Sequence, residues 1–351
     1  MVSNINYDNF EQFRKAMLPM RMLREHSYTI LDTSEGTVFL QIHHAKNYPY
    51  GNIYVSDSTG IRYALSLKNN LRDSNGFCDF DKIDGLEGVY MANVYDDKVV
   101  AEYEAQLTES PSQAIPNPYG RLLQQQQQRT TGLNRKGAPK AKKEVQNIKQ
   151  QKIMLSQHVM TYITFNKGGS WKLVKAPEKD ANGRVITCQG KAGGRSCSLH
   201  LHGLLSPNFP PFYSIDNAVG LVMGVGNVGT TLKTRKDQVN VYFSRDGGMY
   251  WEEAKKGSFI YDYGDHGALM LMAKDNLATN EMIYSWNEGL TWETYLFSES
   301  KVEVTNILND PRTISQNFLL YGGKYDSNST KSVVVALNFE GLHEPVCTGF
   351  D

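Results

Sequence analysis

The octet SRDGGMYW (244–251) contains the residue whose chemistry first needs explaining, Asp246. Beside two glycines, its carboxylate could act as a general base in an open loop or accept the hydrogen bonds of a tight turn. The same spacing recurs in two further octets, TFNKGGSW (164–171) and SWNEGLTW (285–292). These carry Asn166 and Asn287 at the position of Asp246. Because an amide oxygen accepts a hydrogen bond but cannot serve as an ionised base, the repeat favours a structural role for Asp246.

Each octet begins with Ser or Thr, has Asp or Asn third and Gly fifth, and ends with Trp. We expect the first and third side chains to hold the turn, the glycine to supply its backbone conformation and the tryptophan to pack beneath it. The predicted box residues are Thr164, Asn166, Gly168, Trp171, Ser244, Asp246, Gly248, Trp251, Ser285, Asn287, Gly289 and Trp292. A weaker fourth copy, SDSTGIRY, has Ser56 first, Ser58 at the acidic position, Gly60 fifth and Tyr63 last.

Short strands are the elements that would hold these octets in place. Runs rich in Val, Ile, Tyr and Phe end in turns and alternate roughly in polarity, which is typical of strands. They include GNIYVS (51–56), VMTYITF (159–165), QVNVYFS (238–244) and NEMIYS (280–285). Helical periodicity is best in residues 8–25, where Pro19 interrupts it. Ser244 and Ser285 are separated by about the length of one four-stranded propeller blade. The sequence therefore predicts an all-β fold with repeats.

Two histidines, His200 and His202, alternate along the predicted strand SLHLHG and would share one face of it. Such a pair could contribute to a zinc site. No third ligand is identifiable beside them, since His43, His44 and His266 lie elsewhere in the sequence. We therefore favour structural histidines and predict no metal and no cofactor.

Two other motifs suggest chemistry that their context does not support. GVGNVG (224–229) matches the dinucleotide pattern G-x-G-x-x-G, but a polar stretch and a strand follow it in place of the required helix. YDYGDHG (261–267) brings together Asp262, Asp265 and His266, which could act as an acid–base group. A turn between two strands accounts for the same composition, and we favour that interpretation.

The charge balance of this 351-residue chain limits the kinds of partner that it is expected to bind. It has 37 Lys and Arg residues and 37 Asp and Glu residues, so no net field attracts nucleic acid or an anionic membrane. The N-terminal residues lack the apolar core of a signal peptide. The longest apolar run, AVGLVMGVGNVG, is too short and too rich in glycine to span a bilayer. We expect neither nucleic-acid binding nor a membrane span in this chain.

A basic, glutamine-rich segment interrupts the strand pattern. It includes the five-glutamine run Gln124–Gln128 and has few aliphatic residues, so it cannot bury enough apolar surface to order itself. We expect a disordered insertion over residues 100–157, between propeller blades at 1–99 and 158–345. Its basic residues could touch nucleic acid or acidic lipid, but no aromatic residues are interleaved with them as single-strand binding would require.

The four cysteines divide into one close pair and two distant residues. Cys188 and Cys197 flank a short polar loop, so they could close a disulfide in an oxidising compartment or remain two free thiols. Spacing alone does not pair Cys78 or Cys347. Asn328, in the sequence NST, is a glycosylation candidate if the chain is luminal.

The octets resemble the Asp-box, S-x-D-x-G-x-x-W, of sialidases and other β-propellers, a motif that indicates fold more than function. A longer series of motifs resembles one family more closely. In order, these are TYITFNKGGSW, CQGKAGGRSCSLHLHG, AVGLVMGVGNVG, VYFSRDGGMYWEEAKKGSFIYDYGDHGALMLM and IYSWNEGLTWETYLFSE. Together they are similar to the Vps10 domain of sortilin-type sorting receptors, above all the fungal vacuolar branch. The similarity covers residues 26–350 outside the insertion.

This resemblance implies about five blades of a ten-bladed propeller, completed by a missing half or by another chain. It implies a receptor of the Golgi and endosome lumen that carries vacuolar or lysosomal hydrolases from the late Golgi to endosomes, with protein or peptide cargo as its partner and no enzymatic activity. It also implies a Cys188–Cys197 disulfide, and it makes residues 346–351 the start of a cysteine-rich module that contains Cys347. The family's cargo-binding arginine has no counterpart in register, since Arg62 is only the nearest candidate, so the cargo-binding residues are unknown.

Two other functions compete with this one. A sialidase-like glycosidase on an Asp-box propeller would need an arginine cluster and a tyrosine nucleophile with an acidic partner, and the sequence lacks the Arg-Ile-Pro signature of that class. A receptor fragment without function of its own would expose unpaired strands and open blade faces, and it would associate with other chains.

Overall fold

The computed structural model of the chain describes residues 15–19, 23, 27–44, 48–108, 154–187, 197–275, 277–310, 315–326, 329–340 and 342. Within these residues the fold consists mostly of antiparallel strands in four sheets, with the α-helix α1 (Asp97–Thr108), a helical turn at residues 154–156 and two short 3-10 helices. The 3-10 helices are η2 (Lys236–Gln238) and η3 (Asp265–Gly267). The prediction of a β-sheet fold is therefore confirmed.

The first sheet has eight strands in the order β1-β2-β3-β4-β6-β7-β8, with β5 paired to β6. Their bounds are β1 (Tyr28–Asp32), β2 (Phe39–Ile42), β3 (Tyr50–Ser56), β4 (Tyr63–Leu71), β5 (Phe80–Lys82), β6 (Tyr90–Tyr95), β7 (Val159–Thr164) and β8 (Lys172–Leu173). Only one residue pair, Asn70 with Val94, joins β4 to β6. The sheet therefore divides into two four-stranded parts that share a narrow seam.

The other three sheets have four strands each, in the orders β12-β11-β10-β9, β13-β14-β16-β17 and β15-β18-β19-β20. The bounds in the second sheet are β9 (Ser198–Leu201), β10 (Val222–Gly229), β11 (Asn240–Ser244) and β12 (Glu252–Lys256). Those in the third are β13 (Phe259–Gly264), β14 (Leu269–Lys274), β16 (Glu281–Ser285) and β17 (Glu293–Leu296). Those in the fourth are β15 (Ala278–Thr279), β18 (Val302–Leu308), β19 (Asn317–Asp326) and β20 (Ser329–Asn338).

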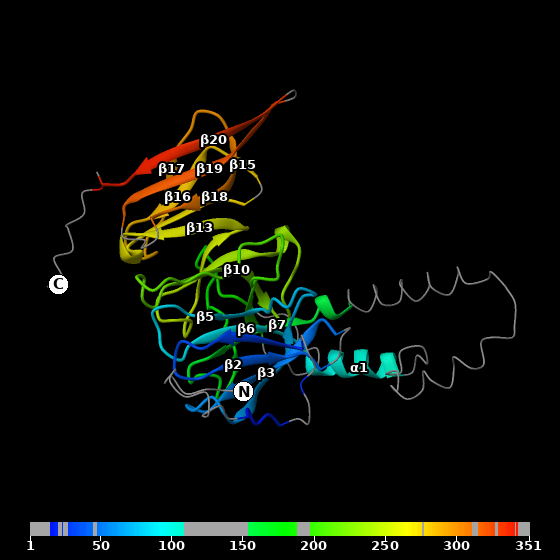
Figure 1. The fold of residues 1–351 in the computed structure, drawn as a ribbon. Coiled ribbons are helices and arrows are strands. Elements are labelled where there is room, and N and C mark those ends of the chain that lie inside the picture. Colours follow the sequence, from blue (N-terminus) through cyan, green and yellow to red (C-terminus); the bar gives the residue numbers. More distant parts are fainter. Residues whose placement is uncertain are drawn as a thin grey trace, which may run out of the picture.

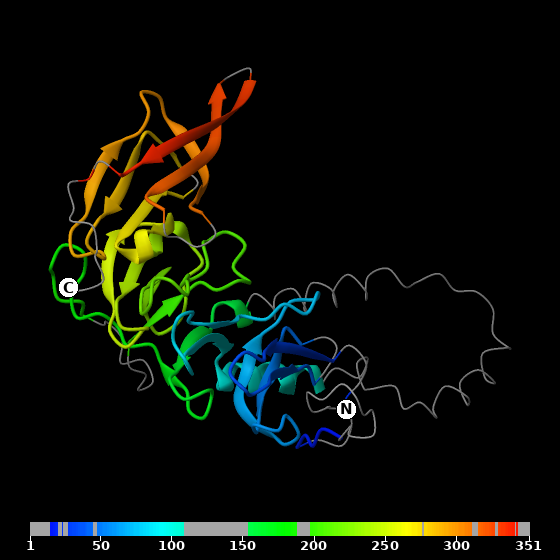
Figure 2. The same ribbon diagram turned by 60° about the vertical axis from the view of Figure 1, so that its left-hand side comes forward.

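Consecutive sheets follow one another in sequence order, from the strands around β2 and β3 to β20 (Figure 1), along a bent path (Figure 2). Strand β14 shows how they pack. Met270 and Met272 lie in the core shared with the preceding sheet, whereas Leu269 and Leu271 lie in the core shared with the following one. Because both faces of the strand are covered, its first five residues, LMLMA, are all apolar and do not alternate.

The prediction of a disordered insertion over residues 100–157 is wrong at both ends of that segment. Its first residues belong to α1, and its last belong to a helical turn before β7. Apolar residues one and four apart, Val99, Val100 and Tyr103, give α1 a stripe that packs on the ends of the strands. The cluster they join is Tyr50, Tyr95, Val99, Val100, Tyr103, Leu155, Val159 and Leu232. The glutamine run Gln124–Gln128 lies outside the described residues.

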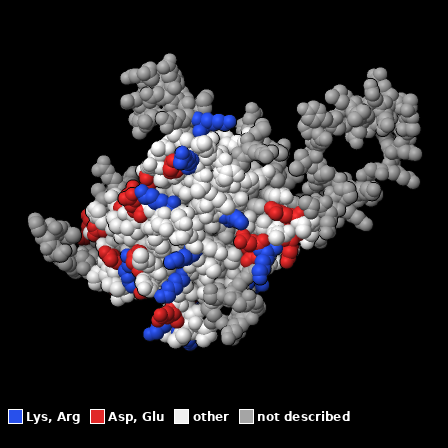
Figure 3. All heavy atoms as spheres, turned by 90° about the horizontal axis from the view of Figure 1, so that it is seen from below, with Lys and Arg blue, Asp and Glu red and all other residues white. Residues whose placement is uncertain are grey.

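No helix in the part of the chain that the structure describes is long and apolar enough to cross a membrane. Most of the helical candidate at residues 8–25 lies outside the described residues. On the face shown in Figure 3, Lys and Arg are interspersed with Asp and Glu. The ion pairs of the structure include Arg245–Glu252 and Lys256–Asp180.

Candidate functional site

The octet that contains Asp246 forms the turn between β11 and β12, and its side chains hold the turn. The Ser244 hydroxyl donates to Asp246 Oδ1 at 2.9 Å and accepts the Gly248 N–H at 2.8 Å. Asp246 Oδ1 also accepts the Tyr250 N–H at 2.9 Å. The carboxylate oxygen is thus engaged by the protein's own groups, which is the arrangement of a turn and not of a free base.

The octets at 164–171 and 285–292 repeat these hydrogen bonds in the turns β7–β8 and β16–β17. The hydroxyls of the first residues, Thr164 and Ser285, accept the N–H groups of Gly168 at 3.1 Å and Gly289 at 2.8 Å. The oxygens of the third residues accept backbone N–H groups four residues on, from Ser170 and Thr291, each at 2.9 Å. All three octets therefore use one turn design, whichever of Asp and Asn is present.

The octets with Asn in place of Asp also differ from the Asp octet at the seventh position. In both Asn octets the spare amide N–H donates to a hydroxyl at the seventh position, from Asn166 to Ser170 at 3.1 Å and from Asn287 to Thr291 at 2.9 Å. In the Asp octet the seventh residue is Tyr250, whose side chain is exposed. The amide donor is thus satisfied where it occurs, so the turn works without a charge.

The tryptophans that close the first two octets pack against strands that come earlier in the chain. Trp251 is buried in the core shared with β6 and β7, and its Nε1–H donates to the Gly248 carbonyl at 3.0 Å. Trp171 is partly buried against Phe80, and its Nε1–H donates to the Ser66 hydroxyl at 2.9 Å. The second octet therefore contributes to the contact between two sheets through Trp251, whereas Trp171 packs within the eight-stranded sheet.

The prediction of a fourth box at 56–63 is wrong in its register. The Ser56 hydroxyl accepts the N–H of Val38 and not that of Gly60. The acceptor in this turn is Asp57, one residue earlier than the expected Ser58, because a carboxylate accepts backbone N–H groups better than a hydroxyl does. Asp57 Oδ1 accepts the backbone N–H groups of Thr59, Ile61 and Arg62.

This turn belongs to a second repeated motif that sequence reasoning missed. DSTG (57–60), DSNG (73–76) and DANG (180–183) all place an aspartate three residues before a glycine of positive φ. As Asp57 does, Asp73 and Asp180 accept the N–H groups two and four residues on, at 2.8–2.9 Å. The spacing D-x-x-G was the available signal for these loops.

His200 and His202 both contact polar groups of the protein, and His202 Nδ1 lies 2.9 Å from the Ser206 hydroxyl. His200 Nδ1 accepts the Thr161 N–H at 3.1 Å, and its Nε2 lies 3.1 Å from the Gly229 carbonyl. Burial lowers the pKa of both histidines to about 4. Among the described residues, no group of three or more His, Cys, Asp and Glu side chains is arranged to hold a metal ion.

The motifs GVGNVG and YDYGDHG, which suggested chemistry in the sequence, also have structural explanations. The glycines of GVGNVG lie in β10, where a Cβ on Gly226 would overlap the His200 carbonyl of the neighbouring strand. Asp262, in β13, accepts the N–H groups of Tyr263 and Asn309, and burial raises its pKa to about 6. Asp265 and His266 form the tight turn η3 that follows.

The cysteines and the glycosylation candidate are only partly described. Cys197 is disulfide-bonded, but its predicted partner Cys188 lies outside the described residues, as do Cys347 and Asn328. Cys78 is a free, buried thiol, and burial raises its pKa to about 11. A thiol with so high a pKa is a poor nucleophile.

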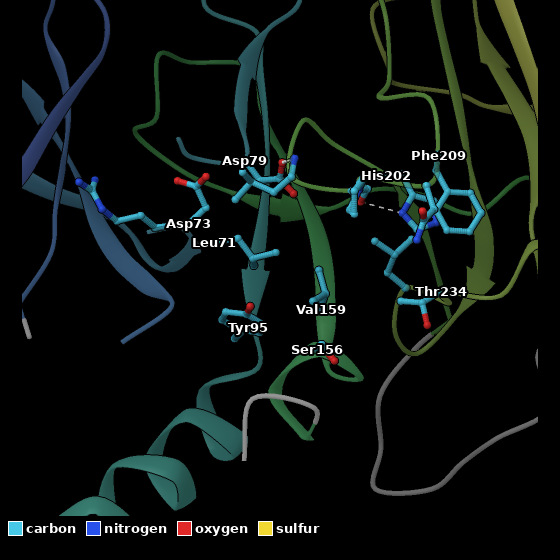
Figure 4. Close-up of a pocket in the computed structure, with 15 residues that line it drawn as sticks. Leu71, Asp73, Asp79, Tyr95, Ser156, Val159, His202, Phe209 and Thr234 are labelled. Atoms are coloured by element: carbon cyan, nitrogen blue, oxygen red, sulfur yellow. Dashed lines mark hydrogen bonds between the residues drawn. The ribbon is translucent and has the colours of Figure 1, made fainter. Parts of the chain in front are cut away.

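The described residues also enclose a cavity of about 320 Å³, which sequence reasoning missed (Figure 4). It lies where the ends of β4 and β6 and the start of β7 meet the loop after β9. Asp79 holds this loop, because its Oδ1 accepts the Leu205 N–H at 2.7 Å while Oδ2 accepts Asn93 Nδ2–H at 3.0 Å. The residues that line the cavity lie as far apart in the sequence as Leu71 and Thr234, so no local pattern could reveal it.

These features define a protein of stacked antiparallel sheets in which three sheets contain the same turn between two of their strands. A family model described as sortilin, neurotensin receptor 3 (Sortilin-Vps10) matches residues 3–110 and 142–307. The chain belongs to the sortilin/Vps10 family.

Fungal relatives are similar over most of this chain. Proteins named vacuolar protein sorting/targeting protein 10 are 32% identical over 326 residues in Talaromyces stipitatus and 35% identical over 326 residues in Aspergillus clavatus. Each match covers 92% of this chain and 18% of the relative. The chain thus spans less than a fifth of the length of the curated relatives it matches.

Solved structures are similar only at a low level. An ancestral GH74 enzyme matches with a TM-score of 0.36 and 13% identity, over 89% of this chain and 32% of that one. The NanB sialidase from Streptococcus pneumoniae matches with a TM-score of 0.35 and 11% identity, over 90% of this chain and 59% of that one. Similarity at this level carries no information about activity.

Proposed function

We propose that this chain is part of the luminal cargo-binding region of a fungal-type vacuolar sorting receptor, which takes vacuolar hydrolases from the late Golgi to endosomes. The observation that carries the proposal is the family match on both sides of the glutamine-rich segment, together with relatives named for vacuolar protein sorting. The proposed role is binding without turnover. The hydrogen bonds of Asp246, Asn166 and Asn287 support it, because all three side chains are committed to turns.

We further propose that the sheets are blades of an incomplete β-propeller, in residues 1–99 and 158–345, and that the octets are its Asp-boxes. The two halves of the first sheet and the three four-stranded sheets would then give five blades. Alternate residues of β14 pack toward different neighbours, as they would in stacked blades. The last sheet also has an uncovered apolar face, including Leu319, Tyr321 and Val334. The remaining blades or another chain would cover this face.

Deletion of the gene that encodes this chain tests the sorting role. We expect vacuolar hydrolase activity to move from the cell to the culture medium, and we expect the intact gene to restore retention. A version of the gene without residues 197–310, which contain the second and third sheets and strands β15 and β18 of the fourth, should fail to restore it. If the deletion strain kept its vacuolar hydrolases inside the cell, the proposed function would be wrong.

A further inference from the structure

The last strand of the fourth sheet, β20, lies at the edge of that sheet. It pairs with β19 on one side, and no strand of the described residues pairs with its other side. The hairpin of β19 and β20 extends beyond the other strands of its sheet (Figures 1 and 2). An edge strand of this kind presents unpaired N–H and C=O groups to any polypeptide segment that can add a further strand.

The register of the hairpin shows which backbone groups face this free edge. The Phe339 N–H donates to the Gln316 carbonyl at 3.0 Å, and the pairing of β19 with β20 continues from there without a shift. Because successive residues of an antiparallel strand bond to opposite sides, every second residue before Phe339 bonds to β19. The residues between them turn their N–H and C=O groups to the free edge, and these are Ser332, Val334, Ala336 and Asn338.

The side chains of β20 do not protect this edge. The last strands of the second and third sheets, β12 and β17, have five and four residues, and their sequences EEAKK and ETYL contain charges. Short length and charge both prevent an edge strand from pairing with another chain. In contrast, β20 has ten residues. Its segment Ser332–Asn338, SVVVALN, contains no charge and no proline, and Val334 within it is 68% exposed. This segment is therefore suited to strand addition.

The charges at the two ends of the segment favour a second copy of the same chain as the partner. Lys331 comes directly before Ser332–Asn338, and Glu340 follows it closely. Antiparallel pairing of two such segments, centred on Val335, brings Lys331 of each copy to the end where Glu340 of the other copy lies. Parallel pairing would instead bring like charges together. The antiparallel contact uses the same surface on both copies, as a two-fold symmetric dimer requires.

We propose that β20 pairs antiparallel with β20 of a second copy of this chain, with Val335 at the two-fold axis. The Val334 N–H of each copy then donates to the Ala336 carbonyl of the other, and the Ala336 N–H donates to the Val334 carbonyl. The two fourth sheets become one continuous sheet. The new strand lies beside β20 and not on the apolar face of its sheet. This inference goes beyond the proposed sorting role and does not depend on it.

Removal of one N–H group at the free edge tests the pairing. Ala336→Pro removes a donor that faces away from β19, so the hairpin keeps its own hydrogen bonds. In sedimentation velocity experiments on the purified chain, we expect a dimer that increases with concentration. The proline variant should dimerise at least about tenfold more weakly, because each copy loses a hydrogen bond to the other.

Ala336→Thr is the matched control for the proline variant. It keeps the N–H group, suits a strand, and should dimerise as the unaltered chain does. If Ala336→Pro dimerised as strongly as Ala336→Thr, the proposal would be overturned. Association through the apolar face of the sheet would give that result, since Ala336→Pro leaves the exposed side chains of Leu319 and Tyr321 in place.

Cysteine cross-linking tests the register and needs no proline in the strand. In the proposed dimer, Val335 of one copy lies opposite Val335 of the other in a pair without hydrogen bonds, where the Cα atoms are about 4.5 Å apart. Val335→Cys should therefore form a disulfide-linked dimer with oxidised glutathione as the oxidant. Val333→Cys would lie about 13 Å from its counterpart and should not. Absence of the Val335→Cys dimer, or equal linking of both variants beyond that of the unaltered chain, would overturn the pairing.

The three consecutive valines provide a further test in the unaltered sequence. The N–H groups of Val333 and Val335 bond to β19, whereas that of Val334 faces the free edge. In the chain labelled with ¹⁵N-valine, exchange of the Val333 and Val335 N–H groups with deuterium should be slow at every protein concentration. Exchange of the Val334 N–H should be fast in dilute solution and at least about tenfold slower where the dimer forms. Exchange at Val334 that did not change with concentration would contradict the proposal.

Discussion

Ile163, the residue before the first octet, lies with its Cδ1 2.6 Å from the position that a Cβ on Gly248 of the second octet would occupy. Phe243, the residue before the second octet, stands in the same relation to Gly289 of the third, with Cε1 at 2.8 Å. The strand end of one sheet thus packs against the turn glycine of the next. The second octet supplies both halves of this contact, since its glycine meets Ile163 and the residue before it, Phe243, meets Gly289.

Gly248→Ala should therefore destabilise the protein for two reasons. Gly248 has a φ of +93°, which an alanine adopts only with strain, and the new methyl group would overlap Ile163. Strain and overpacking together should cost about 2–4 kcal/mol in the free energy of unfolding, measured with denaturant.

Gly183→Ala is the matched control. Gly183 has a φ of +76° in a turn, but a Cβ there would meet nothing within 4 Å. Its replacement should cost only the backbone strain, about 1 kcal/mol. If the two variants lost the same stability, the contact between sheets would not be what requires a glycine at position 248.

Asp246→Asn should be nearly neutral, whereas Asp246→Ala should cost about 1–3 kcal/mol, because alanine leaves the Tyr250 N–H and the Ser244 hydroxyl without their acceptor. Asparagine keeps that acceptor, as Asn166 does in the first octet. Denaturant unfolding of the two variants distinguishes a turn acceptor from a required charge. A loss with asparagine as large as that with alanine would show that the charge is needed.

The octets could be read from the sequence because each one is held by its own side chains. The fourth copy was misread because Asp57, which actually accepts the turn's N–H groups, sits one position before the expected Ser58. The complete burial of Met270 and Leu271 on opposite faces depends on sheets far apart in the sequence. A pattern search within one strand cannot show those neighbours.

The candidate cavity was unpredictable for a similar reason. The sequence favoured a structural role for His202 but could not show which groups it contacts. Its actual contacts come from the loop at 203–209 and from Lys233. α1 was missed because the composition of the glutamine-rich segment obscured the stripe of Val100 and Tyr103 at its start. Long-range packing, and not local propensity, decided both cases.

The pairing of Cys197 with Cys188 stays a prediction that a direct measurement can settle. Since Cys197 is disulfide-bonded, a digest without reductant should contain one peptide pair joined through these two cysteines, seen by mass spectrometry. Cys78 should react with a thiol reagent only after unfolding, because it is buried and its pKa is raised. A linked peptide that contained Cys347 in place of Cys188 would contradict the pairing.

Asp81→Asn should stabilise the protein at neutral pH. Burial, and then the charges of Asp79 and Asp84, raises the pKa of Asp81 to about 6 from 3.8. A carboxyl whose pKa is higher in the folded than in the unfolded state weakens folding as pH rises through about 4 to 6. The variant should gain about 1–3 kcal/mol at pH 7 and nothing below pH 4, as measured by denaturant unfolding at each pH.

Asp57 provides a control of opposite sign. Hydrogen bonds, first from the Thr59 hydroxyl, lower the pKa of Asp57. Asp57→Asn should therefore lose stability at neutral pH, and the loss should shrink in acid. If Asp81→Asn behaved in the same way as Asp57→Asn, the burial cost assigned to Asp81 would be wrong.

The outer face of the last sheet leads to a prediction about association. In β19, Leu320 is buried against the preceding sheet, while Leu319 and Tyr321 on either side of it are exposed on the opposite face. Val334, paired with Tyr321, is 68% exposed.

We expect the isolated chain to associate through this apolar face, since no further sheet covers it among the described residues. Val334→Lys should therefore reduce the associated fraction in sedimentation velocity experiments. Val185→Lys changes a residue that is 70% exposed in a loop and should leave association unchanged. Equal association of the two variants would place the contact elsewhere, and a chain that remained monomeric without substitution would contradict the prediction outright.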